Sequence, residues 1–328
     1  MNIGVALYGL GNVGSGLVEI LHARDDELRS ARGLNLELRH VIIRDPARPR
    51  RVQPRRVELS RDWRAPLEDA QVDVVVETMG GLDTAGIVVE TALRAGKHVV
   101  TANKALIAAR GEELEALAYA CGAELRYEAA VGGAIPVLHA LRGALVANRL
   151  TRVRGILNGT CNYILTRMAE DRLPLADALA RAQELGYAEA DPSADVSGTD
   201  AAQKLVILAR HAFGRWLPLD AVRVEGIEQI TLGDVDDALR RGNVVKLIAE
   251  ASRNDDGAIS LRVAPVEIPA TDALAQVRDE VNAVTLEGDF AGPLTFIGRG
   301  AGSRPTGSAV FADLVELALL HRSRWERN

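Results

Sequence analysis

Apolar residues in the first 130 positions come in short continuous runs, separated by longer segments with helical spacing. The runs predict buried strands at 3–8, 36–43, 72–77, 97–101 and 124–128, and the segments between them predict helices at 12–31, 82–95 and 105–121. Continuous apolar strands are typical of a sheet that is covered on both faces. Strands that alternate with helices indicate βαβ units, so the pattern predicts an α/β domain with a parallel sheet.

The pattern changes after about Pro136. Helical spacing dominates from Cys161 to Phe213, and two extended segments between Asn243 and Ile268 flank Asn254-Asp255-Asp256-Gly257, a sequence that favours a hairpin turn. Further strands are predicted at 280–286 and 294–297, a last helix at 308–322, and a solvated loop in the arginine-rich segment 44–64. A chain of 328 residues with this change of pattern is expected to form two domains.

Composition narrows the class of protein. A hydrophobic content of 48% and a charged content of 26% are ordinary for a globular protein and exclude a disordered chain. The net charge of −6 argues against nucleic acid as the main partner. Two cysteines, Cys121 and Cys161, make no disulfide framework, so a cytoplasmic location is expected. The uncharged segment 1–18 holds five glycines and lacks a basic start, so we predict neither a signal peptide nor a membrane span.

The segment Gly9-Leu10-Gly11-Asn12-Val13-Gly14 is a GxGxxG motif. It follows a predicted strand and opens a predicted helix, which is the context that dinucleotide binding requires. In such a motif the first glycine permits a tight turn, the second lets a pyrophosphate approach the backbone, and the third lets the helix pack on the strand. The helix N-terminus then offers N–H groups to the anion. A dinucleotide site is therefore favoured over a plain glycine-rich turn.

The end of the second predicted strand bears on the choice of cofactor. An acidic residue there accepts the ribose 2′-hydroxyl of NAD, whereas an arginine favours the 2′-phosphate of NADP. Arg44 comes first and is followed by Asp45, with Arg48, Arg50 and Arg51 nearby. We therefore predict NADP, and Asp45 together with the general excess of arginine keeps NAD open.

Two other segments follow predicted strands. Gly80-Gly81 comes after the third strand and Thr101-Ala102-Asn103-Lys104 after the fourth, and ligands bind open α/β sheets at these strand ends. We therefore expect Lys104 near the cofactor, although a solvated lysine at a helix start is the alternative.

Only four of the 39 basic residues are lysines, namely Lys97, Lys104, Lys204 and Lys246. An arginine bias alone explains this scarcity, but lysine can pass a proton and arginine cannot.

Four carboxylates lie within 12 residues and are followed by a lysine: Glu189, Asp191, Asp195, Asp200 and then Lys204. A helix is predicted from about Thr199 to Phe213, so Asp200 and Lys204 share one of its faces. An ordinary helix salt bridge is one explanation. However, the neighbouring apolar residues indicate that the helix is buried, and a buried charged pair stabilises a fold weakly at best. Binding of an ammonium group and transfer of a proton fit the pattern better.

Several motifs together resemble homoserine dehydrogenases over nearly the whole chain. They are GLGNVG, TANKALI, YEAAVGGAIPVL, GILNGTCNYIL, LGYAEADPSADVSGTDAAQKL and GRGAGSRPTGSAVFADL, in that order. The resemblance implies interconversion of L-aspartate 4-semialdehyde and L-homoserine with NAD(P)H, on the route to threonine and methionine. It also implies a Rossmann-type dinucleotide-binding domain at 1–135, an α+β substrate-binding and dimerisation domain at 136–300, and a C-terminal segment at 301–328 that returns to the first domain.

The resemblance also assigns roles to residues. Lys204 and Asp200 match the catalytic pair, with Lys204 as the proton donor, and Lys104 matches a second lysine between cofactor and substrate. The implied substrate-binding residues are Glu189, Asp195, Thr160 and Tyr187, with Glu189 on the amino group. The implied cofactor-binding residues are Gly9, Gly11, Asn12, Val13, Gly14, Arg44, Gly80, Lys104 and Gly302. A monovalent cation, usually sodium, is implied at the main-chain carbonyls of Glu128, Val131, Gly133 and Ile135.

The resemblance further implies a homodimer. Many relatives carry a C-terminal ACT domain that senses threonine, and this chain ends at Asn328, so inhibition through such a domain is not expected. Thr78 departs from the family, where an apolar residue is more usual.

Three rival hypotheses remain at this stage. A covalent mechanism needs a nucleophile, for which Cys161 is the one serious candidate. A second hypothesis is a non-catalytic dinucleotide sensor, but it does not explain the pattern of carboxylates and lysine. Another NADP-dependent oxidoreductase, acting on a different amino-acid aldehyde or imine, fits the carboxylates equally well. We favour direct hydride transfer with proton donation by lysine.

Overall fold

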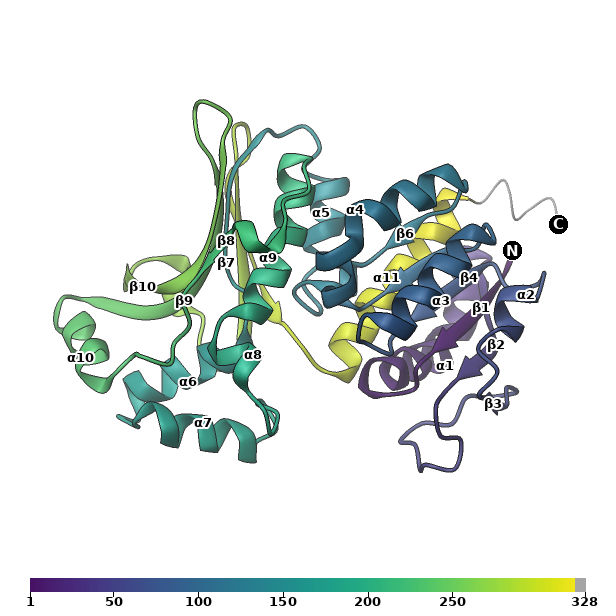
Figure 1. The fold of residues 1–328 in the computed structure, drawn as a ribbon, viewed down its shortest axis with the longest axis horizontal. Helices are drawn as coiled ribbons and strands as arrows, with labels where there is room; N and C mark the ends of the chain where they lie inside the picture. The colour runs from purple at the N-terminus through teal and green to yellow at the C-terminus, as the bar shows by residue number, and fades with distance from the viewer. Residues whose placement is uncertain (322–328) are drawn as a thin grey trace. The chain divides into compact units, whose positions relative to one another are not determined.

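The computed structural model describes residues 1–321 and divides the chain into two compact units. The first unit combines residues 1–134 with the chain from Gly302 onward, and the second comprises residues 135–301. Part of the C-terminal segment predicted at 301–328, including the end of the helix predicted at 308–322, lies outside the described residues. Figure 1 shows the path of the chain through both units.

The first unit is a doubly wound α/β fold. Its parallel sheet has the strand order β3-β2-β1-β4-β5-β6, which is the order of dinucleotide-binding sheets. The strands are β1 (Asn2–Tyr8), β2 (Asn35–Ile42), β3 (Leu59–Ser60), β4 (Val74–Glu77), β5 (His98–Thr101) and β6 (Leu125–Arg126). The helices are α1 (Asn12–Arg32), α2 (Ala65–Glu68), α3 (Asp83–Arg94), α4 (Lys104–Ala120), η1 (Glu128–Ala130) and α11 (Ser303–Leu320). The predicted α/β domain with a parallel sheet is confirmed.

Helix α11 is part of the core of the first unit, although it lies at the far end of the sequence (yellow in Figure 1). Its apolar residues Val310, Leu314 and Leu317 pack in the same cluster as the strand residues of β1 and β4. The contact with α1 is close, because a Cβ atom added at Gly16 would lie 2.0 Å from the carbonyl oxygen of Ser303. The first unit therefore depends on two segments that are far apart in the chain.

The second unit is built on a mixed sheet with the order β12-β11-β7-β9-β10-β8. The strands are β7 (Leu150–Ile156), β8 (Val222–Val224), β9 (Asn243–Arg253), β10 (Ile259–Pro269), β11 (Val281–Gly288) and β12 (Gly292–Arg299). The helices are α5 (Val137–Arg142), α6 (Gly159–Glu170), α7 (Leu175–Glu184), α8 (Ser193–Val196), α9 (Thr199–Phe213), η2 (Leu219–Ala221), α10 (Leu232–Arg240) and η3 (Ala273–Gln276). The α+β class is confirmed, as is the hairpin turn between β9 and β10.

Some predicted elements differ from the structure. The strand predicted at 124–128 is only two residues long, because the chain turns into η1 at Glu128. The arginine-rich segment 44–64 is not wholly a loop, since Leu59 and Ser60 pair with the end of β2. The last helix begins five residues earlier than predicted, at Ser303, because the proline in its first turn needs no intrahelical N–H bond. Within the described part of the chain, no helix has both the length and the apolar character to cross a membrane.

Candidate active site

The GxGxxG motif forms the turn between β1 and α1. Gly9 has a φ of 99°, a conformation that favours glycine. A Cβ atom at Gly14 would lie 2.1 Å from the carbonyl oxygen of Gly9, whereas one at Gly11 would meet nothing within 4 Å. No side chain caps the N-terminus of α1, which begins at Asn12. The turn is therefore tight on the protein side and open at Gly11, which fits a pyrophosphate approaching the N–H groups of the helix.

Thr78 holds this turn from the neighbouring strand. Its hydroxyl group donates a hydrogen bond to the carbonyl oxygen of Gly9 at 2.8 Å. Thr78 therefore adds a side-chain contact to the nucleotide motif.

The arginines after β2 have different surroundings. Arg50 donates to the carbonyl oxygens of Leu10 at 3.0 Å and Asp45 at 3.1 Å, so it supports the loop itself. Arg51 pairs with Glu19 at 2.7 Å. Arg44 is exposed, and its side chain makes no hydrogen bond or ion pair with the residues that the structure describes. Unlike Arg50 and Arg51, Arg44 therefore retains a guanidinium group that can meet a phosphate.

The other predicted cofactor residues lie in the same unit, at strand ends or at a helix start. Gly80 follows β4 with a φ of 73° and is exposed. Lys104 is the first residue of α4, directly after Asn103, whose side chain caps the helix by accepting from the N–H of Leu106 at 3.1 Å. Gly302 precedes α11 with a φ of 120°. The carboxyl ends of β1, β4 and β5 thus carry Gly9, Gly80 and Lys104, as predicted for a ligand at this edge.

The Asp200–Lys204 pair is the centre of the second unit's polar cluster. Both residues lie on α9, four positions apart, and Nζ of Lys204 is 2.7 Å from Oδ2 of Asp200. The same ammonium group donates to the carbonyl oxygen of Leu157 at 2.7 Å. The Lys204 side chain is 13% exposed and that of Asp200 is 9% exposed. The predicted shared face and the buried setting of the helix are confirmed.

Asn158 joins this pair to the acidic loop, a role that is not among those predicted above. Its amide donates to Oδ1 of Asp195 at 2.7 Å and to Oδ2 of Asp200 at 2.9 Å. Its side-chain oxygen Oδ1 accepts from the N–H of Cys161 at 2.8 Å and so caps α6. Asparagine before a helix is a capping signal that was available in the sequence. The two carboxylates that it reaches are not predictable from that signal.

Thr160 and Tyr187 lie next to each other near this cluster. The hydroxyl group of Thr160 donates to the carbonyl oxygen of Tyr187 at 2.8 Å. The Tyr187 ring packs on that of Tyr163, with centroids 5.1 Å apart. Partial burial and the nearby Glu280 carboxylate raise the pKa of Tyr187. Tyr187 is therefore a neutral hydroxyl group at ordinary pH.

The remaining acidic residues are less enclosed. Asp195 lies on α8 and is half-buried, whereas Glu189 and Asp191 are exposed on the preceding loop. The Asp191 carboxylate accepts from Ser193, and this bond lowers its pKa. The side chain of Glu189 has no hydrogen bond or ion pair to any described residue. The structure therefore joins Asp195, Asp200 and Lys204 in one network, and does not join Glu189 to it.

Cys161 is unsuited to the covalent rival mechanism. Its side chain is fully buried, and Sγ lies 3.2 Å from the carbonyl oxygen of Asp195. Burial, together with the nearby carboxylates of Asp195 and Asp200, raises the pKa of the thiol well above its usual value. A reactive thiolate needs the opposite environment.

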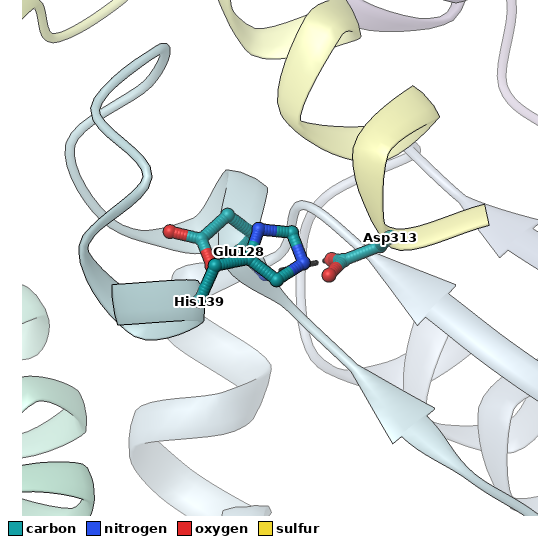
Figure 2. Close-up of side chains that lie close together, drawn as sticks. All are labelled: Glu128, His139 and Asp313. Carbon is teal, nitrogen blue, oxygen red and sulfur yellow. Dashed lines mark hydrogen bonds between the residues drawn. The ribbon is translucent and has the colours of Figure 1, made fainter. Parts of the chain in front are cut away.

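The predicted cation ligands occupy a buried loop after β6. Glu128, Val131 and Gly133 are buried in the first unit, and Ile135 is the first residue of the second. Gly132 and Gly133 have φ values of 72° and 57°, so the chain turns sharply here. The N–H of Glu128 also donates to Oδ2 of Asp313 on α11 at 2.8 Å (Figure 2).

Comparison with protein families decides the identity. Residues 9–128 match the family described as homoserine dehydrogenase, NAD binding domain, and residues 136–315 match the family described as homoserine dehydrogenase. The chain belongs to the homoserine dehydrogenase family.

Individual homoserine dehydrogenases support this membership. The chain is 42% identical to the homoserine dehydrogenase of Bacillus subtilis, over 95% of this chain and 72% of that protein. It is 45% identical to that of Corynebacterium glutamicum, over 96% of this chain and 72% of that protein. It also resembles the crystal structure of a homoserine dehydrogenase from Thiobacillus denitrificans, with a TM-score of 0.93 and 41% identity. The match covers 98% of this chain and 74% of that one.

A further solved structure bears on the cofactor. A hyperthermophilic archaeal homoserine dehydrogenase in complex with NADPH has a TM-score of 0.81 and 26% identity, over 97% of this chain and 98% of that one. As a homoserine dehydrogenase, the chain is an NAD(P)-dependent oxidoreductase that acts on a CH–OH group. It interconverts L-homoserine and L-aspartate 4-semialdehyde, on the route to threonine and methionine. The rival substrates and the sensor hypothesis are not favoured.

Proposed function

We propose that the enzyme reduces L-aspartate 4-semialdehyde by direct hydride transfer, with Lys204 as the proton donor. The observation that carries this proposal is the contact of the Lys204 ammonium group with both Asp200 and the carbonyl oxygen of Leu157, each at 2.7 Å. These two acceptors hold Nζ in place and leave one of its three N–H groups to meet a substrate oxygen. A fixed ammonium group is a suitable general acid for an aldehyde oxygen.

Bound nicotinamide cofactor supplies the hydride. As the hydride reaches the aldehyde carbon, the electron pair of the C=O bond moves onto oxygen, and Lys204 donates the proton that completes the alcohol. Asp200 orients Lys204 and offsets its charge. Asn158 orients Asp200 in turn, through its hydrogen bond of 2.9 Å. In the oxidative direction the same groups act in reverse, so that neutral Lys204 accepts the proton of the homoserine hydroxyl group.

We propose that the substrate amino group binds Glu189, with Asp195, Thr160 and Tyr187 lining the same pocket. The exposed Glu189 carboxylate has no partner among the described residues, which suits it to an incoming ammonium group. Lys104 is proposed to lie against the cofactor and to serve as a second group for proton transfer. Both assignments follow from the match to the family motifs.

One experiment separates recognition of the amino group from the chemistry. Succinic semialdehyde is aspartate 4-semialdehyde without its amino group, so it cannot use Glu189. In Glu189→Gln we expect kcat/KM for aspartate semialdehyde to fall about a hundredfold, because a charge-assisted hydrogen bond is lost. The already slow reaction of succinic semialdehyde should not change. Glu184→Gln, an exposed carboxylate on α7, is the matched control. Equal losses with both aldehydes would refute the assignment.

We further propose NADP as the preferred cofactor, with Arg44 at its 2′-phosphate. The NADPH complex of the archaeal homoserine dehydrogenase supports this choice. Arg44→Ser should raise KM for NADPH about tenfold and leave KM for NADH unchanged, because NADH lacks the 2′-phosphate. Arg32→Ser, at the exposed end of α1, is the control. A native enzyme that prefers NADH by tenfold contradicts the proposal.

A monovalent cation, sodium, is proposed at the carbonyls of Glu128, Val131, Gly133 and Ile135. Carbonyl oxygens are suitable ligands for a hard cation, and the two left-handed glycines of this loop turn several carbonyls within a short stretch. When sodium is replaced by tetramethylammonium at constant ionic strength, we expect activity to fall, since that ion is too large for such a site. Unchanged activity contradicts the cation.

We also propose a homodimer located in the cytoplasm. Strand β12 lies at the edge of its sheet and carries the exposed apolar residues Leu294 and Ile297, features that favour pairing with a second copy. Sedimentation should give a dimer for the native enzyme and a monomer for Ile297→Lys. Cys121 and Cys161 are both free thiols, which suits a reducing compartment.

A further inference from the structure

The first unit contains a buried carboxyl group that the mechanism above does not use. Glu77 is the last residue of β4, and its side chain is fully buried. It lies at the carboxyl edge of the sheet, where β4 pairs with β1 on one side and β5 on the other. A carboxyl group in this position costs desolvation energy that an apolar side chain would avoid. Its hydrogen bonds show what it organises.

One oxygen of Glu77 shapes the loop that follows β4. Oε1 accepts from the N–H of Met79 at 2.7 Å and from the N–H of Gly80 at 3.0 Å. These two N–H groups would otherwise have to find partners elsewhere, because the loop has left the sheet. The exposed glycines of this loop, Gly80 and Gly81, have left-handed φ values of 73° and 77°. Glu77 therefore fixes a turn that is flexible by composition.

The other oxygen of Glu77 reaches the neighbouring strand. Oε2 accepts from the hydroxyl group of Thr101 at 2.5 Å, and this hydroxyl oxygen accepts from the N–H of Asn103 at 3.0 Å. The side chain of Asn103 caps α4 and donates to the carbonyl oxygen of Gly81 at 2.6 Å. The contacts thus close a ring that runs from Glu77 through the Gly80–Gly81 loop, Asn103 and Thr101 back to Glu77.

We propose that Glu77 is a positioning residue for the nicotinamide half of the cofactor. In sheets of this strand order, one half of the dinucleotide lies on the side of β1 and β2, and the other lies on the side of β4 and β5. The ring spans the loops that follow β4 and β5, so it controls Gly80 and Lys104 and leaves the adenosine side untouched. This inference rests on the proposed contacts of Gly80 and Lys104 with the cofactor.

The test compares Thr101→Val with Thr101→Ser in binding alone. Valine has the shape of threonine but removes the hydroxyl group, which leaves Oε2 of Glu77 and the N–H of Asn103 without a partner in the ring. Serine keeps the hydroxyl group. Dissociation constants are measured by fluorescence for the cofactor that binds native enzyme more tightly, NADPH or NADH. They are then measured for the matching ADP-ribose fragment, which lacks the nicotinamide ring.

For Thr101→Val we expect affinity for the whole cofactor to fall about tenfold, and affinity for the fragment to change less than twofold. Thr101→Ser should resemble the native enzyme in both measurements. Equal weakening of both ligands, no weakening of either, or a serine variant as poor as the valine variant would overturn the proposal. These measurements involve no turnover, so their result is independent of the roles proposed for Lys204 and Asp200.

Glu77→Gln provides a second test if the valine variant fails to fold. The amide retains one acceptor oxygen for the N–H groups of Met79 and Gly80, but it presents an N–H group to the Thr101 hydroxyl in place of an acceptor. We expect affinity for the whole cofactor to fall about threefold, with unchanged affinity for the fragment. Affinities that fall equally for both ligands contradict the positioning role.

Discussion

Two lysines in the second unit are both largely enclosed and have different partners. Lys204 on α9 contacts the carboxylate of Asp200 and one backbone carbonyl. Lys246 on β9 is 4% exposed and donates to Oδ1 of Asn162 at 2.8 Å and to the carbonyl oxygen of Val277 at 2.6 Å. Both of its acceptors are neutral. Burial lowers the pKa of Lys246 to about 8.

The comparison shows that burial by itself does not identify a catalytic lysine. The Asn162 amide also donates to the carbonyl oxygens of Val277 and Val281. Lys246 and Asn162 together therefore hold the segment 277–281 against α6. Lys204 belongs instead to a network of carboxylates that includes Asp195 and Asp200. We infer that Lys246 is structural and that Lys204 handles a proton. Substitutions at and around the two lysines test this distinction.

Replacement of Lys204 by methionine should have the largest effect on catalysis. The side chain keeps much of its volume but loses the proton and the charge, so we expect kcat to fall about a thousandfold. The dissociation constant of NADPH, measured by fluorescence, should stay within about threefold, because the cofactor motifs lie in the other unit. A kcat that is unchanged refutes the role of Lys204.

The second prediction concerns Asn158→Asp. Aspartate keeps the acceptor that caps α6, but it loses both amide donors and adds a third carboxylate beside Asp195 and Asp200. We expect kcat to fall about a hundredfold through misplacement of Asp200. Asn158→Ser, which keeps a cap but introduces no charge, should be less impaired. If Asn158→Asp and native enzyme have the same kcat, Asn158 does not position the catalytic pair.

The third prediction concerns the contribution of Lys246 to the pH dependence of stability between pH 8 and pH 10. Its pKa of about 8 in the folded chain is below the unperturbed value of 10.5, so between these values the unfolded chain binds more protons. The free energy of unfolding should therefore rise with pH in this window. Relative to Lys246→Met, the native enzyme should gain about 2 kcal/mol between pH 7 and pH 10, measured by urea unfolding.

Lys246→Met also provides the catalytic side of the comparison. At neutral pH its kcat should remain within about twofold of native, because Lys246 contacts neither the carboxylate cluster nor a proposed ligand. A large loss of kcat in a folded Lys246→Met enzyme would remove the distinction between the two lysines. If the stability of the native enzyme falls from pH 8 to pH 10 relative to the variant, the pKa of Lys246 is not lowered by burial.

The smallest effect is expected for Cys161→Ser. The thiol is buried and has a raised pKa, so the hydride-transfer mechanism gives it no chemical role. We expect kcat within about threefold of native in a standard NADPH oxidation assay. Near-total loss of activity with an intact fold would revive a covalent mechanism.

Much of this architecture is readable from local sequence. The GLGNVG turn lies between β1 and α1 as predicted, and α9 spans Thr199–Phe213 as predicted, because glycine spacing and helical periodicity are local signals. Lys204 and Asp200 meet because residues four apart share a helical face. Such signals come from residues that are close together in the sequence.

Contacts between distant segments could not be predicted in the same way. Asn158 meets Asp195 and Asp200 across 37 and 42 residues of chain, and Glu77 meets Thr101 across 24. Strand β7 is not predicted because Arg152 and Arg154 interrupt its apolar pattern. In the fold Arg152 pairs with Glu250 on the neighbouring strand β9 at 2.6 Å, and Arg154 pairs with Asp272 at 2.6 Å. The role of Glu189, which no described contact supports, remains a prediction from the family motif.

The most direct test of the central claim is the single-turnover rate of NADPH oxidation by Lys204→Arg with saturating L-aspartate 4-semialdehyde. Arginine keeps the positive charge beside Asp200 but does not release a proton at ordinary pH. If Lys204 is the proton donor, the rate should fall at least about a hundredfold. A rate within about threefold of native would contradict the account, because charge alone would then suffice.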